Sequence, residues 1–183
     1  MSLARTRIAV RLLAVAALAA LTAGCFQPMY AEHVDGTPGL REKLLAVEVP
    51  PVDKPNASHD ARIQVEIRNA LAFKLYGNAT GSPPLYRLVL KFTTSRSSLM
   101  IDPLTALPTS ENLGIDAQFN LIEIATDKSV MTGSTFSRVS YDIPGSYQRF
   151  ARARAFRDAE DRAAQEIAEH IQTRLASYFF TAT

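Results

Sequence analysis

Residues 156–175 of this chain read FRDAEDRAAQEIAEHIQTRL. Apolar side chains recur here at the three- and four-residue spacing of one helix face; they are Phe156, Ala159, Ala163, Ile167, Ile171 and Leu175. The charged side chains fall on the opposite face, and they include Arg157, Glu160, Asp161, Glu166 and Glu169. The pattern predicts a long amphipathic helix near the end of the chain, with its apolar stripe buried.

A shorter helix and four strands are predicted upstream of this segment. The helix is expected to begin at Ser58 or Asp60, either of which can cap it, and to stop at Gly77. Short apolar or alternating runs predict strands over residues 44–49, 86–93, 114–125 and 130–141. A slip of the alternation at Ile122 predicts a β-bulge. The order β-α-β-β-β-α predicts an α+β two-layer sandwich, in which two amphipathic helices cover one face of a sheet of about four strands.

Residues 95–112 connect the first two long strands and allow two interpretations. They contain Pro103 and Pro108, and they form either a long flap or a projecting extension of the strands. Because several of their side chains are apolar, they are also a candidate contact surface. The residues of that surface are Arg96, Leu99, Met100 and Ile101.

Residues 1–24 have the composition of a secretory signal. Three arginines, Arg5, Arg7 and Arg11, precede an apolar run over residues 12–23. This run is shorter than the roughly 20 residues that a membrane-spanning helix needs. Three of the chain's 20 basic residues and none of its 18 acidic residues lie in this leader, so the rest of the chain is close to neutral. A near-neutral domain is not expected to bind nucleic acid, because such binding requires many uncompensated basic side chains.

The leader ends at the only cysteine of the chain. Residues 21–25 read LTAGC and resemble the lipobox of bacterial lipoproteins, with signal cleavage between Gly24 and Cys25. We expect the thiol of Cys25 to carry diacylglycerol and its freed amine to carry an acyl chain such as palmitate, which together anchor the protein to a membrane. Because Phe26 and not Asp follows the cysteine, the sorting rule of Gram-negative lipoproteins predicts the periplasmic face of the outer membrane. The chain is thus expected to comprise a signal peptide (1–24), a lipidated tether (25–42) and a single domain (43–183).

No catalytic or metal-binding motif stands out in the sequence. The three histidines are isolated from one another and are expected to be solvated side chains; they are His33, His59 and His170. Residues 133–135, Gly-Ser-Thr, lack the glycine pattern of a nucleophile elbow, and no phosphate-binding glycine loop is present. We therefore expect neither an enzyme nor a metal or other cofactor beyond the acyl groups on Cys25.

Four arginines stand close together at the start of the last helix. They are Arg149, Arg152, Arg154 and Arg157, and we call them the arginine cluster. Aromatic residues lie between them, and no acidic residue occurs from position 146 to position 157. Guanidinium groups bind phosphate and carboxylate groups through paired hydrogen bonds. The cluster is therefore a candidate site for an anionic ligand or partner, and the alternative is a solvated helix start.

Two short runs carry a family resemblance. One is Cys25-Phe26-Gln27-Pro28-Met29-Tyr30, which begins at the lipidation site, and the other is Asp161-Arg162-Ala163-Ala164 in the last helix. Together with the order of helices and strands, they resemble the LptE family of lipopolysaccharide-assembly lipoproteins, in the form common in alphaproteobacteria. The resemblance implies a non-enzymatic outer-membrane lipoprotein that sits as a plug inside the β-barrel LptD, supports assembly of that barrel and helps lipopolysaccharide reach the cell surface.

The resemblance also implies lipopolysaccharide binding through basic side chains near the loop between the first two long strands and near the start of the last helix. In this chain those places hold Arg96 and the arginine cluster. Three other lipid-anchored proteins remain open. An auxiliary lipoprotein of an ABC-type phospholipid-trafficking system would share the compartment but bind other periplasmic proteins. A lipid-anchored hydrolase would need a nucleophile and its base, and a structural envelope lipoprotein would bind no ligand.

Overall fold

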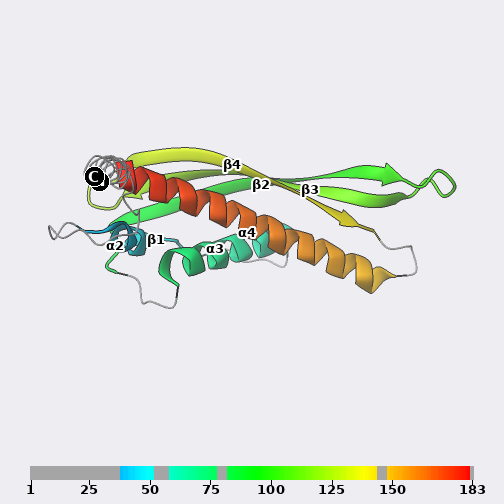
Figure 1. Cartoon of the computed structure of the whole chain (residues 1–183), viewed down its shortest axis with the longest axis horizontal. Coiled ribbons are helices and arrows are strands. Elements are labelled where there is room, and N and C mark those ends of the chain that lie inside the picture. The colour runs from blue at the N-terminus through cyan, green and yellow to red at the C-terminus, as the bar shows by residue number, and fades with distance from the viewer. Residues whose placement is uncertain (1–37, 52–57, 78–81, 144–147, 182–183) are drawn as a thin grey trace, which may run out of the picture. The chain divides into compact units, whose positions relative to one another are not determined.

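The computed structural model describes residues 38–51, 58–77, 82–143 and 148–181. The chain divides into two compact units, residues 1–40 and 41–183, and the second unit holds the sheet and the two long helices. The described helices and strands (Figure 1) are α2 (Leu40–Leu45), β1 (Val47–Glu48), α3 (His59–Tyr76), β2 (Tyr86–Ile101), β3 (Pro108–Glu123), β4 (Lys128–Asp142) and α4 (Arg149–Thr181). The predicted signal peptide and Cys25 lie outside the described residues, so the expected division after residues 24 and 42 stays a prediction.

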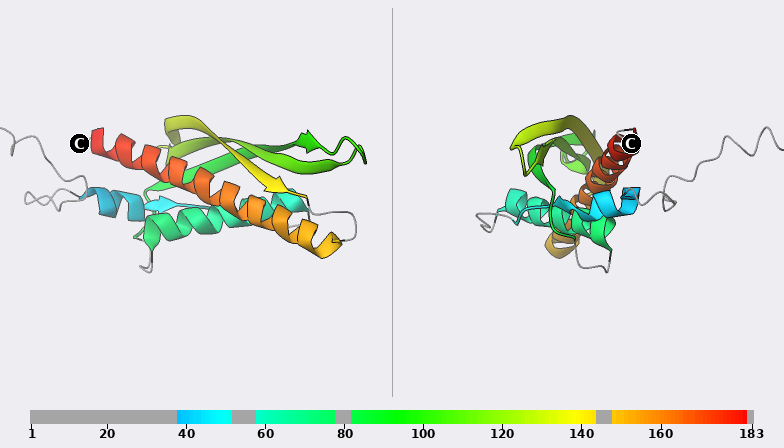
Figure 2. Two further views of the ribbon diagram at one scale, coloured as in Figure 1. Left: turned by 45° about the vertical axis from the view of Figure 1, so that its right-hand side comes forward. Right: turned by 90° about the vertical axis from the view of Figure 1, so that its left-hand side faces the viewer.

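The strands form one mixed sheet in the order β1-β2-β3-β4. β1 runs parallel to β2, whereas β2–β3 and β3–β4 are antiparallel. Helix α4 packs on β3 and β4, and α3 packs along α4 (Figure 2). This arrangement confirms the predicted α+β sandwich, and the bulge predicted at Ile122 is present in the β3–β4 pairing. The fully buried side chains include Ile63, Ile67 and Leu71 of α3, Ile115 and Leu121 of β3, and Ile167, Ile171 and Leu175 of α4.

Helix α3 begins and ends where the sequence predicts. The Ser58 side chain accepts a hydrogen bond of 3.2 Å from the N–H of Ala61, so Ser58 and not Asp60 is the N-cap. Asp60 instead accepts a hydrogen bond of 3.0 Å from the hydroxyl of Thr94 on β2. At the other end Gly77 has a φ of 59°, a left-handed conformation that glycine adopts without strain.

The predicted strand over residues 44–49 is wrong in its first part. Residues up to Leu45 belong to α2, whose sequence LREKLL consists mainly of good helix formers. Strand β1 then spans only Val47–Glu48. Pro50 and Pro51 follow after one further residue, Val49, and they lack the N–H groups that a longer strand would donate to β2.

Residues 95–112 extend the two strands, which decides between the two interpretations of this segment. Strand β2 continues to Ile101, which pairs with Pro108 at the start of β3. Strand β4 pairs with β3 only as far as Asp142, opposite Ser110. The end of the β2–β3 hairpin therefore projects past β4 (Figure 1).

Glu160 of α4 is buried, although the helical pattern places it on the charged face. The physical reason is that α3 packs against α4 and covers a part of that face. The Glu160 carboxylate accepts a hydrogen bond of 2.9 Å from Nη1 of Arg62 and lies 3.1 Å from Nδ1 of His59. Nη2 of Arg62 also pairs with Asp161, at 2.8 Å. His59 is 63% exposed, as expected of a solvated side chain, and it also contacts the buried carboxylate of Glu160.

Candidate functional site

The two basic regions that the sequence singles out meet in the structure. The guanidinium carbon of Arg96, on β2, lies 4.4 Å from the centroid of the Phe156 ring, on α4. A cation–π contact of this kind positions an arginine while leaving its hydrogen-bond donors available. Arg96 and the start of α4, which carries the arginine cluster, therefore lie side by side, and we call Arg96 and the cluster together the arginine surface.

Phe156 is the apolar centre of the arginine surface. Its side chain is buried, and its ring centroid lies 5.1 Å from that of His59 on α3 and 5.6 Å from that of Tyr141 on β4. The His59 ring meets it edge-on, an arrangement that aromatic pairs favour. Side chains from α3 and β4 thus hold in place the ring on which Arg96 stacks.

Glu111 of β3 connects the arginine surface to the sheet. Its Oε1 lies 3.7 Å from Nη2 of Arg152, and its Oε2 accepts a hydrogen bond of 2.5 Å from the hydroxyl of Tyr141. Burial raises the pKa of Tyr141 to about 12; the hydrogen bond and charge of Glu111 add to this increase, and Arg96 and Arg152 oppose it. Tyr141 is therefore a protonated donor at neutral pH, and Arg152 is held by an acidic partner.

The other members of the arginine cluster are differently placed. Arg149, Arg154 and Arg157 are exposed on the first turns of α4. Within the described ranges of the chain, none of the three forms an ion pair. Their charges are thus accessible to an anionic group from outside the described chain. Whether any of the five arginines contacts a ligand stays a prediction.

An apolar surface lies at the same end of the sheet. Five large side chains of the β2–β3 hairpin are more than half exposed, and we call them the hairpin tip: Leu99, Met100, Ile101, Leu104 and Leu107. Phe150, at the start of α4, is almost fully exposed as well. The exposure of Leu104 and Leu107 is not evident from the sequence, where only the flanking prolines at 103 and 108 indicate a turn.

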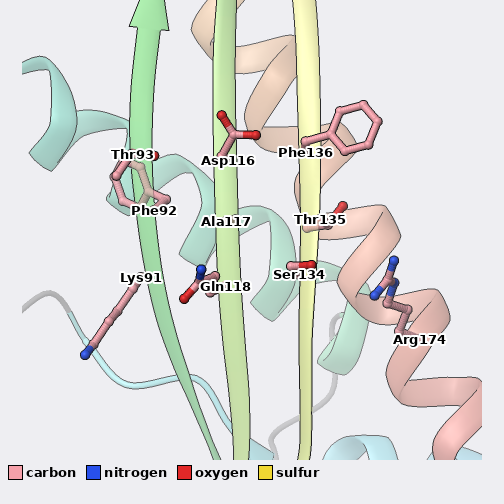
Figure 3. A pocket seen from close by; sticks show the side chains of 10 residues that line it. All are labelled: Lys91, Phe92, Thr93, Asp116, Ala117, Gln118, Ser134, Thr135, Phe136 and Arg174. Atoms are coloured by element: carbon pink, nitrogen blue, oxygen red, sulfur yellow. The ribbon is translucent and has the colours of Figure 1, made fainter.

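A shallow hollow of about 500 Å³ lies on the sheet (Figure 3). Across β2, β3 and β4 its lining residues form two rows, Lys91, Gln118 and Ser134, then Thr93, Asp116 and Phe136. These rows lie on the sheet face opposite the buried side chains of β3, since neighbouring residues of a strand point to opposite faces. Asp116 is already paired with Arg138, at 2.8 Å. The open face of the sheet is thus mainly polar.

The structure describes some, but not all, of the remaining candidate residues. His170 is exposed, and its Nδ1 lies 2.9 Å from the hydroxyl of Thr135. His33 and the predicted cleavage and lipidation residues, Gly24 and Cys25, lie outside the described residues. The described ranges contain no group of three or more His, Cys, Asp or Glu side chains that could bind a metal ion. Among the helices that are described, none combines the length and the apolar character of a membrane span.

The family model described as "LptE: Lipopolysaccharide-assembly" matches residues 44–175. The chain belongs to the LptE family. This confirms the resemblance drawn from the sequence, and it places the chain in a family of lipopolysaccharide-assembly lipoproteins. Arg96 and the whole arginine cluster lie within the matched residues. No curated protein sequence is significantly similar to the chain.

Solved structures share the LptE-like fold at low sequence identity. A candidate lipoprotein from Caulobacter crescentus CB15 is 23% identical, with a TM-score of 0.60 over 79% of this chain and 97% of that one. Rare lipoprotein B from Shewanella oneidensis is 16% identical, with a TM-score of 0.52 over 74% of this chain and 97% of that one. A minor lipoprotein from Acinetobacter baumannii is 15% identical, with a TM-score of 0.50 over 72% and 88% of the two chains. At these identities the likeness concerns the fold.

Proposed function

We propose that this chain is a lipid-anchored outer-membrane protein that partners an LptD-type β-barrel, as a plug and as an assembly factor. The family match over residues 44–175 carries the proposal, because it includes every described strand and most of α4. The lipobox-like LTAGC run at residues 21–25 supports the anchor. Acyl chains on Cys25 would hold the domain at the membrane and raise its effective concentration next to the barrel.

The open face of the sheet supports a position inside a barrel. The interior of an outer-membrane barrel is polar. On the open face of the sheet, Gln118 and Ser134 offer amide and hydroxyl groups. Lys91 and Asp116 offer charges of both signs. Such a face can exchange its bound water for hydrogen bonds to a polar wall, directly or through remaining water.

The arginine surface supports the second part of the proposal, which is contact with lipopolysaccharide during its transport to the cell surface. Phosphate groups of lipopolysaccharide are anionic, and hydrogen bonds between guanidinium and phosphate are stronger than neutral ones. Arg96 is positioned by its contact with Phe156, while Arg149 and Arg154 are exposed. This combination of one positioned and several accessible guanidinium groups suits a large ligand with more than one phosphate.

Co-purification tests the partnership. The native full-length lipoprotein is extracted from the outer membrane with detergent, and the proteins that accompany it are identified and quantified. We expect a large β-barrel at near-equal stoichiometry. Cys25→Ser is the matched variant: it removes the lipid attachment site, so we expect less barrel complex with an unchanged circular-dichroism spectrum. An ABC-transport component in place of the barrel would contradict the proposal and support the phospholipid-trafficking alternative.

A further inference from the structure

The hairpin tip is exposed to an extent that calls for a partner or an apolar medium. Leu104 is 94% exposed, and the other four side chains of the tip are each more than half exposed. Single exposed apolar residues are common on protein surfaces, but a contiguous group marks a contact surface. The tip joins the ends of two strands that pair with each other.

Hydrogen bonds within the turn that closes the hairpin satisfy several of its backbone donors. The N–H of Asp102 bonds to the carbonyl of Leu107 at 2.9 Å, and the N–H of Ala106 bonds to the carbonyl of Asp102 at 2.8 Å. The Asp102 carboxylate accepts a hydrogen bond of 2.9 Å from the N–H of Leu104. The prolines at 103 and 108 have no N–H. These bonds lower the cost of moving the turn out of water, because unpaired backbone groups are costly in an apolar medium.

The charge around the tip favours an anionic surface. Residues 95–112 and 149–157 together hold five arginines and two acidic residues. Both acidic residues have partners, since Asp102 binds the turn and Glu111 binds Tyr141 and Arg152. Exposed apolar side chains next to accessible basic ones are the combination found in elements that dip into the boundary between head groups and acyl chains.

We propose that the hairpin tip inserts into the acyl region of an anionic lipid layer while Arg149, Arg154 and Arg157 contact the lipid phosphates. The apolar side chains reach about 5–10 Å into the boundary between head groups and acyl chains, and the arginines stay on the head-group side of it. A lipid layer matches the tip because the exposed side chains of the tip are apolar and the arginines at the start of α4 are accessible. The proposal goes beyond the barrel partnership, since it requires neither a barrel nor lipopolysaccharide.

Tryptophan fluorescence tests the insertion, because the chain contains no tryptophan. Leu104→Trp places a single tryptophan in the tip, and Phe73→Trp places one on α3, at another exposed apolar residue. Each full-length lipidated variant is reconstituted into phosphatidylcholine vesicles with and without phosphatidylglycerol. We expect a blue shift and quenching by brominated acyl chains for L104W on vesicles that contain phosphatidylglycerol. F73W is expected to show neither.

A second pair of variants tests the arginines. Replacing Arg149, Arg154 and Arg157 by Gln in the L104W background is expected to lower the equilibrium constant of insertion by about fivefold for each arginine. Arg174→Gln in the same background is the matched control on the same helix. Equal quenching of L104W and F73W would overturn the insertion, and unchanged insertion in the triple variant would overturn the phosphate contacts. Because the vesicles contain no barrel, neither result depends on the partnership with LptD.

Discussion

Glu160 provides the sharpest test of how the two long helices are held together. Its side chain is fully buried between α3 and α4, where it pairs with Arg62 at 2.9 Å and with His59 at 3.1 Å. Removing one partner of a buried ion pair costs about 3–5 kcal/mol, because the remaining charge is left without compensation. Asp161 lies 2.8 Å from Arg62 and keeps part of that compensation. We therefore expect Glu160→Ala to lower the free energy of unfolding by about 3 kcal/mol, the lower end of that range.

Glu169→Ala is the matched control for this substitution. Glu169 also pairs across the two helices, with Lys74 at 3.5 Å, but its side chain is 66% exposed. Exposed pairs contribute about 0–1 kcal/mol, because water screens them. Urea unfolding of the full-length protein, followed by circular dichroism, gives both changes in the free energy of unfolding on one scale. If Glu160→Ala and Glu169→Ala lower the free energy of unfolding by amounts that agree within about 0.5 kcal/mol, the stabilising role of the buried carboxylate is refuted.

The arginine surface, a glycine of β4 and Tyr141 give three further predictions. Replacing Arg149, Arg152 and Arg154 together by Ala is expected to weaken lipopolysaccharide binding in a direct titration, whereas Arg174→Ala leaves it unchanged; equal affinity of the triple variant and the original chain would remove the assignment. A Cβ at Gly133 would lie 2.5 Å from the Phe119 ring, so Gly133→Ala is expected to cost about 1–3 kcal/mol in urea unfolding, and an unchanged midpoint would contradict this packing. Because the pKa of Tyr141 is raised to about 12 in the folded chain from about 10 in unfolded peptides, its contribution to stability is present below pH 10 and lost as the pH rises toward 12. In an ultraviolet titration, Tyr141→Phe should lose the phenol ionisation that the original chain shows at the highest pH. Identical titration curves for the variant and the original chain would contradict the assignment.

The long helices and strands are predictable from the sequence because each follows a local rule. The apolar period of α4 and the cap and stop of α3 at Ser58 and Gly77 depend on residues within the same segment. The exception is the region of α2 and β1, where a short apolar run satisfies both helix and strand patterns. A strand of two residues exists only through its pairing with β2, and local periodicity cannot indicate such a partner.

The composition of the arginine surface is predictable, but its geometry is not. The run of arginines before Phe156 is visible in the sequence, and so is the basic residue at position 96. The contact of Arg96 with Phe156 depends on the register of the extended hairpin and on how α4 lies against the sheet. The burial of Glu160 likewise requires a second helix beside α4. These features depend on tertiary packing, which overrides the pattern of a single segment.

Photo-crosslinking from Gln118 tests most directly whether the open face of the sheet meets a barrel. Gln118 lies on β3 in the middle of that face (Figure 3), so a photoreactive amino acid placed there reacts with whatever covers the sheet in intact cells. If the chain is a plug, irradiation links it to an LptD-type β-barrel. The absence of a barrel adduct, or an adduct with an ABC-transport component in its place, would contradict the proposed partnership.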